Sequence, residues 1–259
     1  MNINSFILYV ILPAFTLLLI FTNKYYYNKR QSQRMRFHMG EDLFFGNIIT
    51  PIFALLIILG IYTEILDIDF IKEIRWEIIT ILTISILSLL AGIGTGAHIV
   101  SVSIERAKKM NDNNETFNRI LYFFHWPFGH IASVVPSLLI VYLLILLDLF
   151  KGKIFLINDL QILILSVSGV ALGLVLTGVT IATHITRMIY YTLLIISFSI
   201  LLVLRAESIT LLEHGIAYFF SLTFITTTVA LGIYRNAHLI SKSIHNNLQS
   251  RFENGERIE

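Results

Sequence analysis

Seven apolar runs, most of them close to 20 residues long, limit what this chain can fold into. A helix rises about 1.5 Å per residue, so a run of about 20 residues crosses the roughly 30 Å hydrocarbon core of a bilayer. Hydrophobic residues make up 56% of the chain and charged residues 14%, against about 25% charged in a soluble domain. We therefore predict an all-α integral membrane protein with seven transmembrane helices, at about 6–22, 44–63, 77–100, 127–147, 160–183, 189–204 and 215–236.

The connections between these runs are short and offer no room for a soluble domain. We therefore interpret residues 1–259 as a single transmembrane domain, with one N-terminal helix followed by three helical hairpins. The first run follows "MNINSF", which lacks basic residues, and no small-residue cleavage site comes after it. We expect it to be a retained helix and not a signal peptide.

The basic residues indicate the direction of the chain through the membrane. Of the 19 Lys and Arg residues, 14 fall on one side of the predicted spans, and the opposite side holds only Lys72, Arg75, Lys151, Lys153 and Arg205. Short cytoplasmic loops carry an excess of Lys and Arg. We therefore predict a multi-pass protein with its N-terminus outside and its C-terminus in the cytoplasm.

A short polar pattern occurs twice, as "AHIVSVSIE" at 97–105 and as "AHLISKSIH" at 237–245. Both copies end a predicted span, and aligning them also superposes the Gly-Ile pairs at 92–93 and 232–233. Positions separated by three and seven residues share one face of a helix. The pattern predicts a weak internal repeat of the hairpins, although serines are ordinary in transmembrane helices and chance similarity remains the alternative.

Histidines gather near the predicted cytoplasmic ends of the spans. Neutral imidazole is a good ligand for haem iron, copper or zinc, and polar groups inside a membrane usually face the bundle interior. A b-type haem needs two imidazoles at one depth, for which the candidates are His98, His130 and His238. For a metal ion, the candidate ligands are His98, His130, His184, His238, Glu105 and His245. The competing interpretation is a set of hydrogen-bonded or interfacial histidines.

Three functions are compatible with this pattern. The first is a haem or transition-metal centre for membrane electron transfer, with a quinone or a partner subunit as its redox partner and glycines such as Gly94 and Gly129 making room for the macrocycle. The second is a transporter or channel for an ion or small substrate, with threonines such as Thr223 and Thr227 along its pathway. The third is a sensor or assembly subunit whose C-terminal helix docks a cytoplasmic partner.

Several chemistries are excluded by composition. The chain contains no cysteine, which removes disulfides and thiolate metal sites. No lysine lies within 215–236, so a retinal Schiff base has no attachment point in that span. The lipid bilayer is the predicted partner and nucleic acid is not. The sequence identifies no reaction, and whether the protein is an enzyme stays open.

Overall fold

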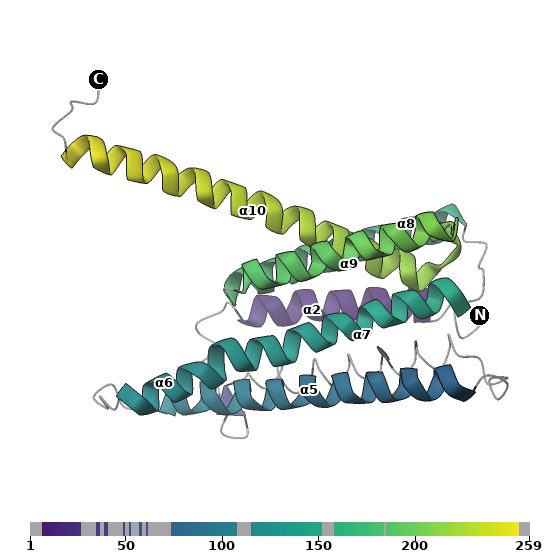
Figure 1. Cartoon of the computed structure of the whole chain (residues 1–259), viewed down its shortest axis with the longest axis horizontal. Coiled ribbons are helices and arrows are strands. Elements are labelled where there is room, and N and C mark those ends of the chain that lie inside the picture. Colours follow the sequence, from purple (N-terminus) through teal and green to yellow (C-terminus); the bar gives the residue numbers. More distant parts are fainter. Residues whose placement is uncertain are drawn as a thin grey trace.

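The computed structural model describes most of the chain as a bundle of long helices (Figure 1). The described residues are 7–26, 35–36, 39–40, 49, 52, 57–58, 61, 74–107, 115–151, 158–183 and 185–253. The helices are η1 (Ile7–Ile11), α2 (Leu12–Tyr26), α5 (Ile74–Ala107), α6 (Glu115–Phe123), η4 (Phe124–Gly129), α7 (His130–Lys151), α8 (Asp159–Ala182), α9 (Thr186–Ala206), η5 (Leu211–Glu213) and α10 (Gly215–Glu253). A two-residue strand pair, β1 (Met35–Arg36) with β2 (Met39–Gly40), interrupts this pattern.

The predicted all-helical fold is confirmed, and several of its helices have the length and composition of membrane spans, but the predicted number of seven is not confirmed. Five helices in the described part of the chain are long and apolar enough to cross a bilayer: Ile79–Glu105, Glu115–Phe150, Asp159–Ala182, Thr186–Ala206 and Gly215–Ala237. They correspond to the last five predicted spans. The first predicted span contains a shorter apolar helix, Tyr9–Ile20. The second, 44–63, lies largely outside the described residues.

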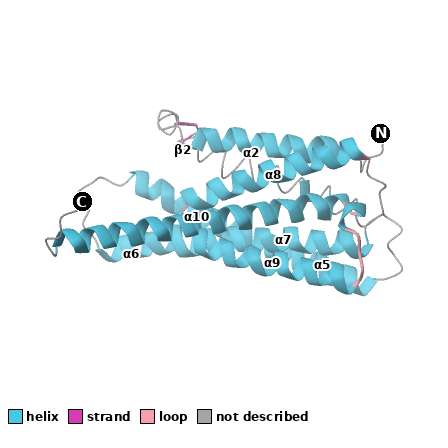
Figure 2. Ribbon diagram, turned by 90° about the horizontal axis from the view of Figure 1, so that it is seen from above, coloured by secondary structure: helices cyan, strands magenta, loops and turns pink. Residues whose placement is uncertain are grey.

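From α5 to α10, successive long helices run in opposite directions, as their short connections require, whereas α2 runs in the same direction as α5 (Figure 1). The start of α2 and the end of α10 lie at opposite ends of the long axis (Figures 1 and 2). The end of α5, the start of α6 and the α8–α9 connection share the end toward which α10 projects (Figure 1). Arg119 of α6 and Arg187 at the start of α9 lie at that end, whereas Arg205 lies in the last turn of α9 at the other. The bundle therefore has one end at which the basic positions of several helices collect.

Helix α10 forms the centre of the bundle and α5 lies at its edge. Half of the residues in the most apolar window of α10 are buried, against 6% for that of α5. Helix α10 packs against α7, α8 and α9, while α5 packs against α7 and η4 (Figure 1). Apolar side chains along α5, such as Leu82, Ile86 and Leu89, are exposed. This pattern suits a helix whose outer face contacts lipid.

Two glycines and two threonines bring α8 and α10 into close contact. A Cβ at Gly173 would lie 2.7 Å from the Thr226 Cβ, and one at Gly169 would lie 3.0 Å from the Phe219 carbonyl oxygen. The hydroxyls of Thr223 and Thr227 each lie 3.1 Å from an α8 carbonyl oxygen, that of Gly169 and Gly173 respectively. Small residues four apart are typical of tightly packed transmembrane helices. These two threonines are fully buried and hold the two helices together.

Thr223 offers a test of this contact. Replacing it by valine keeps the shape and removes the hydroxyl, which also lies 2.9 Å from the Phe219 carbonyl of its own helix. We expect a loss of about 0.6 kcal/mol in the free energy of unfolding in mixed micelles, the average for an interhelical hydrogen bond in a membrane protein. Thr228→Val is the matched control, since the Thr228 hydroxyl bonds only to Phe224 of its own helix. Equal losses in both variants would contradict the interhelical contribution.

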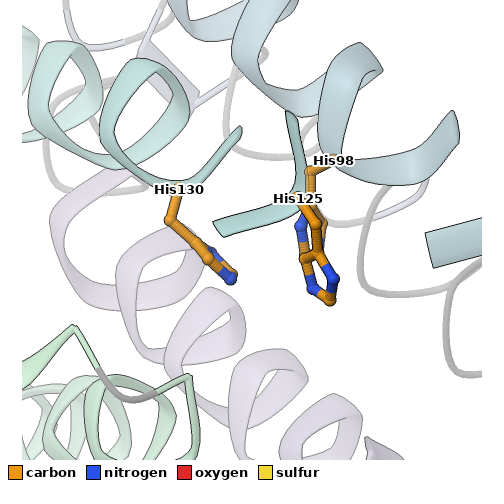
Figure 3. A group of neighbouring side chains, drawn as sticks. All are labelled: His98, His125 and His130. Atoms are coloured by element: carbon orange, nitrogen blue, oxygen red, sulfur yellow. The ribbon is translucent and has the colours of Figure 1, made fainter. Parts of the chain in front are cut away.

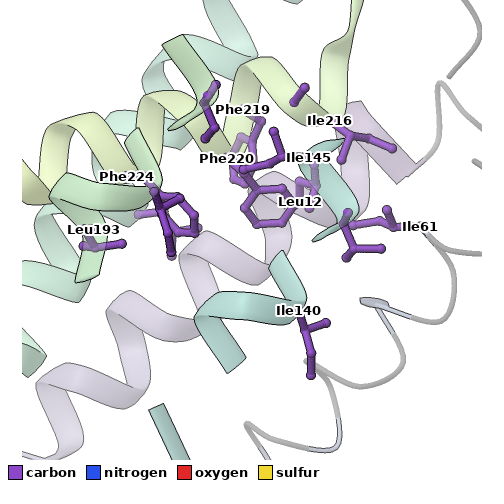
Figure 4. Packing of buried hydrophobic residues seen from close by; sticks show 14 of the residues in the cluster. Leu12, Ile61, Ile140, Ile145, Leu193, Ile216, Phe219, Phe220 and Phe224 are labelled. Atoms are coloured by element: carbon purple, nitrogen blue, oxygen red, sulfur yellow. The ribbon is translucent and has the colours of Figure 1, made fainter. Parts of the chain in front are cut away.

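Large apolar side chains fill the bundle toward the end opposite the projecting part of α10. Phe219 is fully buried and Phe224 is 2% exposed, and Leu12 of α2, Ile145 of α7 and Leu193 of α9 belong to the same cluster (Figure 4). The cluster draws residues from α2, α7, α8, α9 and α10. Its interlocking packing fixes their relative positions, since in lipid the contact itself and not exclusion of water holds helices together.

A carboxylate lies buried at this end, just past the predicted boundary of the 127–147 span. Asp148 of α7 is 3% exposed and accepts a 2.8 Å hydrogen bond from the Ala217 backbone N–H in the first turn of α10. The first N–H groups of a helix have no partner within the helix. Asp148 therefore ties the end of α7 to the start of α10, next to the buried His214.

Candidate metal centre

Three histidines meet at the end of the bundle where α5 contacts η4 and α7. His98 of α5, His125 of η4 and His130 of α7 each offer a ring nitrogen, and these atoms all lie within 4.8 Å of one another (Figure 3). The His98 ring centre is 4.5 Å from that of His130 and 5.0 Å from that of His125. His130 is 7% exposed, and the Nδ1 atom of His98 is buried with no hydrogen-bond partner among the described residues. Such a cluster could hold a metal ion.

A π-helical turn brings His125 and His130 to the same side. In an α-helix of 3.6 residues per turn, positions five apart point about 140° away from each other. The turn Phe124–Gly129 is a π-helix with Pro127 inside it, and a π-turn accommodates one extra residue, so that positions five apart approach one face. The His125 and His130 ring centres are accordingly 5.7 Å apart.

Two glycines allow α5 to approach η4 and α7 closely enough for His98 to join the pair. A Cβ at Gly129 would lie 3.0 Å from the His98 Cβ and 2.6 Å from the Phe124 carbonyl oxygen. One turn before His98, a Cβ at Gly94 would lie 2.3 Å from the backbone nitrogen of Ser133. Neither position can accept a side chain without moving a helix.

Glu105 lies beside the cluster, two turns beyond His98 on α5. Its carboxylate oxygens are 2.8 and 2.9 Å from the Nδ1 atom of His125. The side chains of His125 and Glu105 are 22% and 38% exposed, so this edge of the cluster is open to its surroundings. The hydroxyl of Ser101 donates to the His98 carbonyl oxygen and not to an imidazole ring. A carboxylate, not a serine, therefore orients a ring nitrogen here.

The spacing suits a single ion. With metal–nitrogen bonds of about 2.0–2.1 Å, nitrogens around a tetrahedral ion lie about 3.4 Å apart. The three nitrogens lie within 4.8 Å of one another, so they would have to come closer by up to about 1.4 Å to hold one ion. Three neutral imidazoles would leave a fourth position for water or another ligand, as in catalytic zinc sites. The cluster could therefore offer an ion three nitrogens and leave one position open.

The structure brings together part of the predicted site. His98 and His130 lie in contact, and Glu105 joins them through His125, which was not among the predicted ligands. His184 lies outside the described residues, and so do the side chains of His238 and His245, although both positions belong to α10. The predicted layer with His184 and His238, and the proposed use of His245, remain predictions.

The two glycines named as space for a haem lie in tight contacts. A Cβ at Gly94 would meet the α7 backbone, and a Cβ at Gly129 would meet His98 of α5 and the Phe124 carbonyl oxygen of η4. Among the described residues, a Cβ at Gly92 or Gly96 would have nothing within 4 Å. Within the described part of the chain, the close helix contacts of α5 therefore lie at Gly94 and not at Gly92 or Gly96.

The fold and this cluster define a helical protein with membrane-spanning character and a candidate three-histidine metal site. Comparison of the chain with protein-family models, with curated proteins and with solved structures gives no match.

Proposed function

We propose that this protein is a multi-pass membrane protein that binds a transition-metal ion through His98, His125 and His130. The convergence of three imidazole nitrogens within 4.8 Å carries the proposal. The three residues come from α5, η4 and α7, so the site depends on the packed bundle. A contact between one histidine and one carboxylate is common on protein surfaces. Here, however, three imidazoles gather around the buried Nδ1 atom of His98, which has no hydrogen-bond partner among the described residues, and hydrogen bonding alone does not explain this arrangement.

The position of the site supports exchange of the ion or of a fourth ligand with water. His130 is buried, whereas His125 and Glu105 are partly exposed. The cluster lies near the end of the bundle where basic positions collect, which the positive-inside rule assigns to the cytoplasm (Figure 1). We accordingly propose that the site opens toward the cytoplasm, with the N-terminus outside.

A haem b held by His98 and His130 receives less support from the geometry. With metal–nitrogen bonds of about 2.0–2.1 Å, two trans imidazoles place their ring centres about 6 Å apart with the macrocycle between them. The observed ring centres are 4.5 Å apart, and η4 packs directly against α5 at Gly129. If the protein transfers electrons to a quinone or a partner subunit, we propose that a redox-active ion such as copper or iron at this site carries them.

The other two functions have weaker support. A transport pathway along the threonines is not favoured, because Thr223 and Thr227 are fully buried between α8 and α10. Docking of a cytoplasmic partner has one observation in its favour: α10 continues as a helix to Glu253, past the apolar segment that ends at Ala237 (Figure 1). A metal-binding subunit that docks a cytoplasmic partner through α10 would combine the proposed metal site with the third function.

Titration of the detergent-purified, metal-free protein with Co²⁺ tests the proposal. We expect one ion per chain and a visible absorption band of the intensity typical of four-coordinate cobalt. Zn²⁺ added afterwards should remove the band, since zinc generally binds such ligands more tightly than cobalt. An absorption spectrum of the protein as isolated tests haem at the same time. Absence of any saturable binding of Co²⁺, Zn²⁺ or Cu²⁺ would refute the proposal.

A further inference from the structure

We propose that Glu105 is the positioning residue of this metal site: it holds His125 so that the Nε2 atom of that ring binds the ion. This inference rests on the proposed function and adds the way in which α5 controls a ligand carried by η4. Glu105 and His125 are 20 positions apart in sequence, and their contact spans the α5–η4 interface.

The contact fixes which ring nitrogen is free. An ionised carboxylate can only accept hydrogen bonds, so the Nδ1 atom of His125 must carry the proton when it contacts both Glu105 oxygens at 2.8 and 2.9 Å. The lone pair of a neutral ring then lies on Nε2. Metal-binding histidines commonly donate their other ring N–H to a carboxylate, which sets the ring orientation and raises its basicity. The Glu105–His125 pair has this arrangement before any ion binds.

The charge of Glu105 also suits a divalent ion at this place. Three neutral imidazoles leave both positive charges of the ion uncompensated, and a charge near the membrane interior needs a partner. Glu105 supplies a negative charge beside His125, so only the ring of His125 would separate its carboxylate from the ion. Imidazole donors with no thiolate favour zinc, copper, nickel or iron over calcium and magnesium, which prefer oxygen ligands. The site should therefore select a divalent transition-metal ion.

Glu105→Ala and Glu105→Gln test this role in the full-length protein. We expect Glu105→Ala to weaken Co²⁺ binding by about 10- to 100-fold, the usual cost of losing such a partner. Glu105→Gln should lose less, since its amide oxygen still accepts the hydrogen bond without the charge. At saturating Co²⁺ the visible spectrum of both variants should match that of the wild type, because no direct ligand has been removed. Glu115→Ala is the matched control, since Glu115 is an exposed glutamate paired with Arg119 on α6.

A spectroscopic measurement separates positioning from a general effect on stability. In protein with ¹⁵N-labelled histidines, the metal-free wild type should show one ring in the Nδ1–H form that becomes a mixture of tautomers in Glu105→Ala. Wild-type affinity in Glu105→Ala, or an unchanged tautomer, would overturn the inference. A changed cobalt spectrum at saturation would also overturn it, because Glu105 would then be a direct ligand. Failure of the wild type itself to bind Co²⁺ would instead refute the proposed function.

Discussion

His130→Ala is expected to lower the affinity for Co²⁺ or Zn²⁺ by at least about 100-fold, the upper end of what loss of a partner outside the first coordination shell costs. His130 is 7% exposed, and its ring is in contact with that of His98. Its removal leaves two imidazoles, and the remaining coordination positions pass to water. Isothermal titration of metal-free protein in micelles measures the change directly.

His214→Ala provides the matched control. His214 is 6% exposed, almost the same as His130, but it lies directly before α10 at the opposite end of the bundle. Both variants lose a buried imidazole of the same size, so a general effect of a new cavity should appear in both. Metal affinity should fall only in His130→Ala. Equal affinities in the two variants would remove His130 from the site.

Gly94→Ala is expected to destabilise the folded protein by about 3 kcal/mol, at the upper end of the usual cost of overpacking. The new Cβ would lie 2.3 Å from the Ser133 backbone nitrogen and 2.4 Å from the Ala132 carbonyl carbon. Backbone atoms cannot rotate away as a flexible side chain can, so α5 and α7 must separate. Separation moves His98 away from His130, and we expect metal affinity to fall together with the unfolding midpoint in mixed micelles.

Gly92→Ala, two residues earlier on the same helix, should behave differently. A Cβ at Gly92 has nothing within 4 Å, and alanine has the higher helix propensity by up to about 1 kcal/mol. The expected result is an unchanged or slightly raised unfolding midpoint with unchanged metal affinity. Similar destabilisation by both substitutions would show that α5 does not approach α7 at Gly94.

Part of the candidate site could be predicted from the sequence, and part could not. The depth of His98 and His130 in neighbouring spans followed from counting residues along the apolar runs, and the structure brings these two rings together. His125 was missed because five residues separate it from His130, a spacing that points away on a regular α-helix. Pro127 between them was the available signal, since proline and π-turns both disturb the α-helical hydrogen-bond pattern.

The same limit applies to the polar groups that join the helices. The sequence displays Gly169 and Gly173 four residues apart, a spacing that indicates a helix contact, but not that Thr223 and Thr227 lie opposite them. The sequence left open whether these threonines line a pathway or join two helices, because a hydroxyl stripe has the same appearance in either role. Asp148 lies close to a predicted span boundary, and its burial and its hydrogen bond to Ala217 could not be predicted from the sequence because both depend on how α7 and α10 pack.

By itself, the sequence favoured a lipid bilayer as the surroundings in which the protein folds. Apolar runs of membrane-spanning length and a low charged fraction require helices that satisfy their own backbone hydrogen bonds in lipid, and short connections make successive helices antiparallel. Only the tertiary structure decided which helix faces meet, because every lipid-compatible helix is apolar all round and its periodicity no longer marks a buried side. The close helix contacts at Gly94 and Gly129 determine which face of α5 meets its neighbours. Together with the π-turn before His130, they place His98, His125 and Glu105 close together.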